Sequence, residues 1–224
     1  MSIADLLTGT LAEEIVAQPQ LRVYVPTTPA TGVAVRAAKQ LGSQQLAIVE
    51  GFTKLDGDQR DWVTDVFTLL RKGLLGVAIT PIQLDVAGRT NLSGFGAPGN
   101  LKSALIGPRG LPDNNDTPCP MWYLLGANSD RTLVERVDIV CGPAPSGLGQ
   151  RTLLTPAGCF DLVAGSGWRA RWLAPGGAEA VAAVPAFPIA IPDGTPTRDA
   201  CNPGTLVALE AVDAAGSRRR EFGE

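Results

Sequence analysis

Glycine and proline interrupt this chain so often that long helices have little room to form. The sequence holds 26 glycines and 18 prolines among its 224 residues, a combined share well above the roughly 12% of an average globular domain. Glycine loses more backbone entropy on folding than any other residue, and proline cannot donate a backbone hydrogen bond. From about Gly88 onward, these residues divide the sequence into short apolar runs. This pattern favours many short strands joined by long turns.

Residues 1–87 carry signals of both helices and strands. Ser2 can cap a helix whose leucines and isoleucines share one face, and Pro19 lies just beyond the end of that helix. The segment PATGVAVRAAKQLG is compatible with a helix that ends at Gly42, or with a short strand followed by a helical turn. We expect strands over 21–25, 46–52 and 74–86.

The clearest helical pattern of the chain is DQRDWVTDVFTLLRKG, residues 58–73. Its apolar residues form one broad stripe, acidic residues stand near its start, and basic residues precede Gly73 at its end. Both ends suit the helix dipole, and glycine commonly follows a helix. The sequence therefore predicts a helix here. We interpret Asp56, Asp58 and Asp61 as the acidic start of this helix rather than as a metal site.

Beyond Gly88 the apolar runs have the period of strands. TLVERVDIV alternates apolar and polar residues, as a half-exposed strand does. WRARWL places Trp168, Ala170 and Trp172 on one predicted face and its two arginines on the other. GANSD, residues 126–130, suits a turn between two strands. We expect strands over 121–125, 132–141, 152–154, 160–163, 168–173, 187–191 and 205–212.

These patterns predict an α+β, β-dominated fold. A mixed helix and strand region over 1–87 is followed by an antiparallel sandwich- or barrel-like sheet with long Gly/Pro loops. The β-rich region spans 88–217 and contains an extended loop over 88–120, which is longer than a connection normally needs. Residues 218–224 begin with three arginines and predict a solvated tail. All three parts can belong to one compact domain.

Histidine is absent from the sequence. Its absence excludes Ser-His-Asp and Cys-His catalysis and any histidine-ligated zinc site. A net charge of −3 gives no electrostatic signature of nucleic-acid binding. No apolar run reaches the roughly 18 residues that suggest a membrane span, and the N-terminus lacks the pattern of a signal peptide. We therefore expect no membrane partner and a protein made in a cytoplasm.

The four cysteines, Cys119, Cys141, Cys159 and Cys201, all lie in the second half of the chain. No two of them form a C-x-x-C pair, which argues against a zinc ribbon. Cys141 and Cys159 stand in strand-like apolar contexts and are interpreted as small buried hydrophobic residues. Disulfides are the alternative, although a reducing compartment opposes them.

The stretch SGFGAPGNLKS, residues 93–103, has the glycine spacing of a dinucleotide-binding loop, G-x-G-x-x-G. Such a loop needs an apolar strand before the glycines, a helix after them, and an acidic residue about twenty positions further on. Here polar residues precede the glycines, the following apolar stretch halts at Pro108, and no acid stands near Pro118. Pro98 also removes a backbone N–H from the loop. We interpret 93–103 as a surface loop, within an excursion long enough to reach a partner.

Other short patterns that suggest chemistry have ordinary structural explanations. PDNND, residues 112–116, lacks the spacing of a calcium loop and fits a turn. The sequence around Ser166 is not a complete nucleophile elbow, and no histidine exists to activate it. Glu13 and Glu14 fit the solvated face of a helix. We therefore predict no catalytic residue, no cofactor or cofactor-binding residue, and no metal ligand.

Charged residues make up only 18% of the chain, against roughly 25% in an average soluble domain. A free monomer usually exposes more charge than this, so we infer that neighbouring subunits cover much of the surface. The leading hypothesis is a non-enzymatic structural subunit of a large assembly, namely a bacteriophage virion protein such as a capsid decoration, connector or tail component. Its partners would be further copies and other structural subunits, in a virion assembled in the host cytoplasm. The candidate interface residues are Ile3, Leu6, Leu7, Leu11, Phe95, Arg218, Arg219 and Arg220.

Two alternatives belong to other functional classes. One is an α/β enzyme that binds a nucleotide or uses carboxylates through the loop 93–103. The other is a glycan-binding β-domain that stacks sugars on Trp168 and Trp172. Against the glycan hypothesis, tryptophans on one strand more often fill a core than form a binding face.

Overall fold

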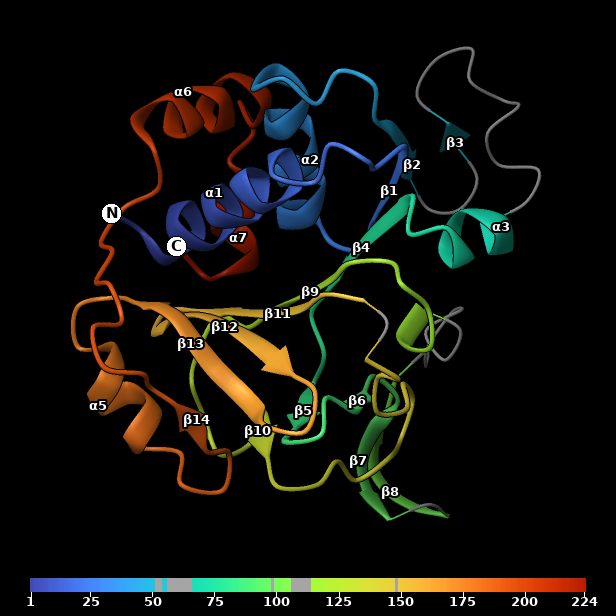
Figure 1. Cartoon of the computed structure of the whole chain (residues 1–224), viewed down its shortest axis with the longest axis vertical. Helices are drawn as coiled ribbons and strands as arrows, with labels where there is room; N and C mark the ends of the chain where they lie inside the picture. The colour runs from blue at the N-terminus through green and yellow to red at the C-terminus, as the bar shows by residue number, and fades with distance from the viewer. Residues whose placement is uncertain (51–53, 56–65, 98, 106–113, 148) are drawn as a thin grey trace.

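A nine-stranded sheet runs through the middle of the molecule and has a layer of other elements packed on each face (Figure 1). The computed structural model describes residues 1–224 except 51–53, 56–65, 98, 106–113 and 148. The strand order is β14-β13-β12-β11-β9-β4-β1-β2-β3. The strands are β1 Val23–Pro26, β2 Ala47–Glu50, β3 Lys54–Leu55, β4 Leu75–Ile79, β9 Met121–Leu124, β11 Arg151–Thr155, β12 Gly158–Val163, β13 Gly167–Leu173 and β14 Ile189–Ala190.

Five neighbouring strands at the centre of this sheet, β2, β1, β4, β9 and β11, all run parallel. Long connections separate these strands in the sequence, which lets the chain return and lay each strand down in the same direction. Antiparallel pairs lie to either side of these five strands: β12 pairs with β11 and with β13 across short turns, and β3 pairs with β2 at the other edge. The predicted β-dominated antiparallel sandwich or barrel is therefore wrong, because the fold is α/β with a largely parallel sheet. Strands from 1–87 and from 88–217 lie side by side in it.

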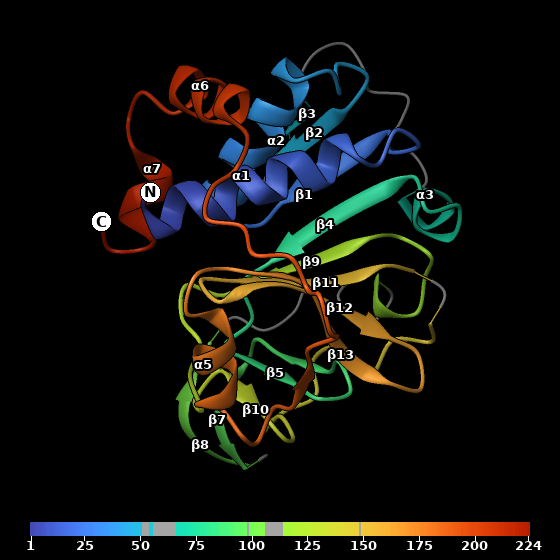
Figure 2. The same ribbon diagram turned by 60° about the vertical axis from the view of Figure 1, so that its left-hand side comes forward.

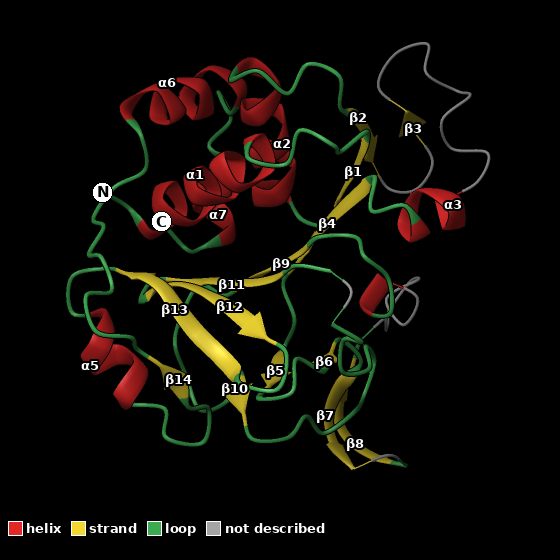
Figure 3. Cartoon of the chain, in the orientation of Figure 1, coloured by secondary structure: helices red, strands yellow, loops and turns green. Residues whose placement is uncertain are grey.

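Helices cover one face of the sheet (Figures 1 and 3). They are α1 Ile3–Val16, α2 Pro29–Gln40, α6 Pro203–Val212 and α7 Ser217–Glu221. The structure confirms the predicted cap of α1, because the Ser2 hydroxyl accepts a hydrogen bond from the Asp5 backbone N–H at 3.0 Å. Of the two structures predicted for PATGVAVRAAKQ, the chain forms the helix. This helix begins with a capping box between Thr28 and Thr31.

The segment 205–212, predicted as a strand, belongs instead to helix α6. The Asn202 side chain accepts a hydrogen bond from the Gly204 backbone N–H at 2.9 Å, and Pro203 occupies the first helical turn. Both are strong helix-start signals. The Glu13 carboxylate of α1 also accepts hydrogen bonds from the Asn202 backbone N–H and the Thr205 hydroxyl. A short apolar run does not distinguish a strand from a buried helix, and here the cap and the packing against α1 decide.

The other face of the sheet is covered by smaller elements (Figure 2). These are helix α5 Gly177–Ala182, a three-stranded sheet of β5 Gln83–Asp85, β6 Thr90–Asn91 and β10 Leu133–Val134, and a hairpin of β7 Gly94–Ala97 and β8 Asn100–Ala104. Of the helix predicted over 58–73, the structure describes α3 Val66–Arg71, and the start, with Asp56, Asp58 and Asp61, lies outside the described residues.

The strand predicted over 132–141 is reduced to the two residues of β10. Beyond it, two backbone N–H groups bond to side chains, and the segment meets another strand again only at Cys141, whose backbone N–H donates to the Thr90 carbonyl of β6 at 2.8 Å. The Val137 backbone N–H donates to the Asp85 carboxylate at 3.3 Å, and the Asp138 backbone N–H donates to the Gln83 side chain at 2.9 Å. Side-chain acceptors that reach the backbone in this way replace the regular ladder of a sheet.

Trp168 and Trp172 lie on opposite faces of the sheet, which corrects the prediction of a shared face. The register between β12 and β13 shifts between Cys159 and Phe160, so one extra residue enters β13. An extra residue turns every following side chain to the other face. Trp168 therefore packs edge-on against Tyr123 in one core, whereas Trp172 belongs to the core under the helices. Both tryptophans are buried, and they form no glycan-binding face.

The C-terminal residues are not the solvated tail that the sequence predicts. The Arg218 guanidinium is fully buried and bonds to the Asp5 carboxylate at 2.9 Å and to the Asp213 carboxylate at 3.0 Å. Glu221 accepts a hydrogen bond from the Ala30 backbone N–H at 2.6 Å, and Glu224 accepts one from the Ile3 backbone N–H at 2.8 Å. The last residues thus close the starts of α2 and α1, where helix dipoles favour negative charge.

Replacing Arg218 with methionine should strongly destabilise the fold. The change leaves the Asp5 and Asp213 carboxylates without their buried cation, and such an unpaired charge costs about 3–5 kcal/mol. Chemical denaturation of Arg218→Met and of the parent chain measures this difference. Arg220→Met is the matched control, because the Arg220 side chain is bonded at an exposed site to the Ala215 carbonyl, and a change within about 0.5 kcal/mol is expected. Equal losses in both variants would contradict the role assigned to Arg218.

Acid should destabilise the protein through the same cluster. Burial raises the pKa of Asp5 and Asp213, but hydrogen bonds from Ser2, Ser217 and Arg218 outweigh it and hold each pKa below its ordinary 3.8. A depressed carboxyl pKa stabilises the fold above that ordinary value and loses its effect as the pH falls through the lower folded value. The free energy of unfolding should therefore drop below about pH 4. Asp213→Asn should be less stable at neutral pH and show a shallower acid decline.

Candidate functional site

The glycines of SGFGAPGNLKS form the hairpin of β7 and β8 rather than a phosphate-binding loop. Gly94 has φ +146°, and a Cβ atom there would lie 2.0 Å from the Ser103 carbonyl oxygen of the facing strand. Gly96 has φ +106°, and its Cβ would lie 2.8 Å from the Asn100 carbonyl oxygen. Only glycine permits so close an approach with this backbone conformation. The element that follows the glycines is the strand β8 and not a helix, so this motif supports no nucleotide site.

The parallel strands place a different region in the position where α/β proteins bind ligands. From β1 the chain moves to β2 on one side, whereas β4 lies on the other side of β1. Strand order therefore reverses between β1 and β4. In open α/β sheets, ligands bind beyond the carboxyl ends of the strands at such a reversal. This carboxyl edge is the candidate functional site.

The described residues at this edge come from the ends of β1 and β4. The Thr27 hydroxyl donates a hydrogen bond to the Ala78 carbonyl at 2.6 Å, which ties the two strand ends together. Helix α2 starts immediately afterwards, and Glu221 occupies its first turn by accepting a hydrogen bond from the Ala30 backbone N–H. Phe222 packs against Gly126, just beyond the end of β9. The C-terminal segment therefore forms one wall of the carboxyl edge.

Two connecting segments leave the carboxyl edge side by side. Residues 80–82 join β4 to β5, and residues 125–132 join β9 to β10. Because β4 pairs with β9 and β5 pairs with β10, the two connections start next to each other and end next to each other, between the two sheets. We call them the inter-sheet junction. Within it, the Thr80 hydroxyl and both polar atoms of the Asn128 amide are buried and have no hydrogen-bond partner among the described residues.

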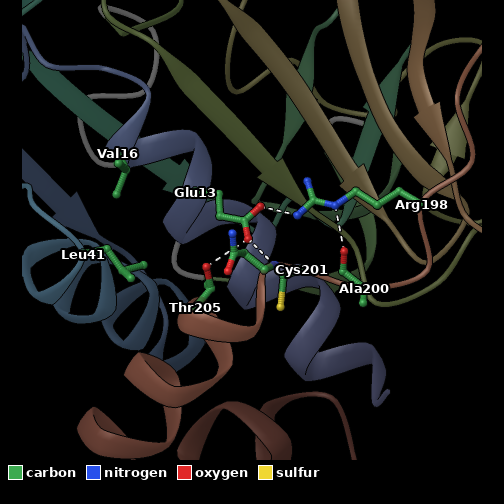
Figure 4. Close-up of a pocket in the computed structure, with 8 residues that line it drawn as sticks. Glu13, Val16, Leu41, Arg198, Ala200, Cys201 and Thr205 are labelled. Carbon is green, nitrogen blue, oxygen red and sulfur yellow. Dashed lines mark hydrogen bonds and ion pairs between the residues drawn. The ribbon is translucent and has the colours of Figure 1, made fainter.

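A separate cleft of about 510 Å³ lies on the helical side of the sheet (Figure 4). It lies beside Val16 and Leu41, at the ends of α1 and α2 that lead into the starts of strands, and so away from the carboxyl edge. The Glu13 carboxylate in it already accepts bonds from Arg198, Asn202 and Thr205. The Arg198 guanidinium lies 5.5 Å from the centre of the Trp172 ring. Glu13 is thus held by structural bonds and is not free for chemistry.

Some of the predicted interface residues lie on the surface, and others lie in the interior. Ile3 and Phe95 are exposed, at 39% and 37%. Leu6, Leu7 and Leu11 are buried within the chain itself, so they are not available to a partner. Arg218 is buried, Arg219 is bonded to Glu210, and Arg220 is bonded to the Ala215 carbonyl.

The charged residues of α1 are less solvated than the sequence suggests. Glu13 is bonded to Arg198, and Glu14 is bonded to Arg171 of β13. The helix is held to the sheet partly by these ion pairs, so Glu13 and Glu14 have structural partners. Across the described part of the chain, no three metal-ligating side chains gather into a cation site.

Sequence reasoning missed the carboxyl edge because its polar residues look like ordinary turn residues. Thr27 and Thr80 each follow an apolar run and stand near a proline, and Asn128 lies in the predicted turn GANSD. The usable signal is a polar residue directly after a buried strand. That signal has meaning only once the strands are known to be parallel, because only then do their carboxyl ends meet at one edge.

No known protein-family model matches the chain. Among curated proteins, it is similar to the cholesterol ring-cleaving hydrolase IpdB subunit of Rhodococcus jostii, with 29% identity over 153 residues. The match covers 63% of this chain and 56% of the relative. The chain therefore spans only about half the length of that relative.

Solved structures show that the fold is shared with subunits of several enzymes. The decarboxylase AibA/AibB matches with a TM-score of 0.76 and 20% identity, over 98% of this chain and 100% of the other. Rhodococcus jostii IpdAB matches with a TM-score of 0.74 and 20% identity, over 99% and 98%. Glutaconate coenzyme A-transferase from Acidaminococcus fermentans matches with a TM-score of 0.79 and 14% identity, over 97% and 96%. The chain thus has the α/β fold of coenzyme A-transferases.

These similarities overturn the leading functional hypothesis. The prediction of a non-enzymatic virion protein is wrong, since the curated relative is a hydrolase subunit and the proteins that share the fold are enzymes. They favour the first alternative, an α/β enzyme, although the loop 93–103 does not provide its nucleotide site. In the described part of the chain, no helix is long and apolar enough to cross a membrane.

The thiols should be unreactive in the folded protein. All four cysteines are free and buried, and burial raises the pKa of Cys119 and Cys159 and raises that of Cys201 to about 11. Since the thiolate is the reactive form, an aromatic disulfide reagent at neutral pH should react at least about 100-fold more slowly with the native chain than with the unfolded chain. One native thiol that reacts as fast as a free thiol would contradict this expectation.

Proposed function

We propose that this chain is one subunit of a two-chain enzyme that acts on acyl-coenzyme A thioesters. The observation that carries the proposal is the agreement in fold over almost the whole chain with enzymes of this kind. One of them is named a coenzyme A-transferase, and a further similar structure is an acyl-CoA transferase from Escherichia coli, with a TM-score of 0.67. The sequence similarity to the IpdB hydrolase subunit supports the part of the proposal that makes this chain an enzyme subunit.

A companion subunit is the second part of the proposal. The decarboxylase is named for two chains, AibA and AibB, and the hydrolase for IpdA and IpdB. The similarity in sequence is to a protein named as a subunit. We therefore infer that the partner is a different chain that completes the enzyme, rather than a set of virion proteins.

The carboxyl edge is the part of this chain that we assign to the substrate. It lies at the reversal of strand order, where α/β proteins bind their ligands. Because the sequence contains no histidine, this subunit would transfer protons through groups other than imidazole. An acyl thioester suits such a site, because thiolate is a good leaving group and the reaction needs only moderate activation.

Purification of the tagged chain from its native host tests the proposal. We expect a second protein of similar fold to co-purify in a fixed ratio, and the complex to consume acyl-coenzyme A with release or transfer of coenzyme A. Thiol release and mass spectrometry of the acyl products measure this activity. The chain expressed alone is the control and should be at least about 100-fold less active, because an incomplete site loses its positioning of the reactants. A complex with no effect on any acyl-coenzyme A offered would contradict the proposal.

A further inference from the structure

The hairpin of β7 and β8 stands out from the fold with apolar side chains in solvent. Figures 1 and 2 show it at the end of the molecule opposite the helical layer. All five residues of β8 are exposed, and Phe95 of β7 is 37% exposed. A two-stranded hairpin by itself is only marginally stable in water. Its apolar side chains therefore need an explanation, and a partner that covers them provides one.

Hydrogen bonds at the root hold the hairpin in place. The fully buried Asn91 side chain donates to the Gly94 carbonyl at 2.8 Å and accepts from the Ser93 backbone N–H at 3.0 Å. The Gly96 backbone N–H donates to the Asp138 carboxylate at 2.9 Å. The position of the hairpin is therefore fixed before any partner binds, which lowers the entropic cost of association.

The strand register places apolar side chains on both faces of the hairpin. Phe95 pairs with Ser103, so Leu105, two residues further on, shares the face of Phe95 and lies diagonally across from it. Leu101 pairs with Gly96, the residue after Phe95, and therefore lies on the opposite face. Leu101 and Leu105 are 40% and 54% exposed. Both faces thus offer apolar contacts, as in an arm that enters a groove of another chain.

The charge of the hairpin indicates what kind of chain covers it. Lys102 is the only ionic residue between Thr90 and Leu105, and it is exposed without an ionic partner among the described residues. It is also the middle residue of β8. If β8 paired antiparallel with β8 of a second copy along its whole length, two lysines would face each other, which destabilises a sheet. Charge complementarity therefore favours a different chain, one that carries a carboxylate.

We propose that the β7–β8 hairpin is the arm that binds the companion subunit, with its apolar side chains in a groove of that subunit and Lys102 beside a carboxylate at the rim. This inference rests on the proposed function, and it names the surface by which the two chains recognise each other. Aromatic residues held on a fixed support often dominate binding energy. Phe95, unlike the buried leucines of α1, is therefore the anchor of this contact.

Sedimentation of the complex purified from the host, over a range of dilutions, measures the dissociation constant of the two chains. Phe95→Ser should raise this constant at least about tenfold, because an aromatic anchor carries much of the binding energy. Lys102→Glu should also raise it about tenfold, since it brings two negative charges together. That second loss should shrink as the salt concentration rises, because salt screens exposed charges.

Two exposed residues away from the hairpin serve as matched controls (Figure 1). Val207 of α6 is 71% exposed, which is more than Phe95, and Lys72 is an exposed lysine just after α3. Val207→Ser and Lys72→Glu repeat the two chemical changes outside the proposed contact. Both variants should bind the companion subunit as tightly as the parent does.

A photo-reactive phenylalanine analogue gives a second measurement that leaves the hairpin apolar and folded. Placed at position 95, it should cross-link to the companion subunit, and placed at position 207 it should not. If both hairpin variants bind the companion as tightly as the parent, or if the analogue at position 95 joins two copies of this chain, the inference is wrong and the proposed function stands. If no second protein co-purifies with the parent, the proposed function itself fails.

Discussion

Burial of both faces of the central strands is the constraint on which the rest of this structure depends. Trp122 and Tyr123 are consecutive in β9 and point to opposite faces, yet both are completely buried. Trp122 lies near Tyr24 under the helices, and Tyr123 packs against Trp168 on the other side. A parallel sheet requires such covering layers, because its strands are apolar on both faces. The helices and the small elements beneath the sheet supply these layers.

Three arginines tie helix α1 to other parts of the chain. Arg171 joins β13 to Glu14 of α1, Arg198 joins the segment before α6 to Glu13, and Arg218 joins α7 to Asp5. The low charge content is therefore not a sign that subunits conceal the whole surface. Arg218 and Asp213 are buried, so removal of either partner would leave the other buried and unpaired. The Arg218 contacts hold α7 against α1, and the Glu221 carboxylate holds the C-terminal segment to the start of α2 at the carboxyl edge.

The arrangement connects the fold to the proposed activity. A parallel sheet collects the ends of β1, β4 and β9 at one edge, and the C-terminal segment and the inter-sheet junction border that edge. The conspicuous glycine motif lies in a hairpin and serves strand pairing, whereas inconspicuous turn residues such as Thr27 border the carboxyl edge. A structure that places its site at strand ends needs no continuous sequence motif, which agrees with the absence of one in this chain.

The sequence by itself determined the local elements: the helix capped by Ser2, the strands MWYL and GWRARWL, and the exclusion of histidine chemistry. These follow from neighbouring residues, through capping and periodicity. Only the tertiary structure decided that the central strands run parallel, that 205–212 is a helix against Glu13, and that one extra residue in β13 separates Trp168 from Trp172. It also decided the candidate site, since the ends of β1, β4 and β9 come from distant parts of the sequence and meet at one edge only in the parallel sheet. Strand direction, register and burial depend on contacts between distant segments, and no local pattern records them.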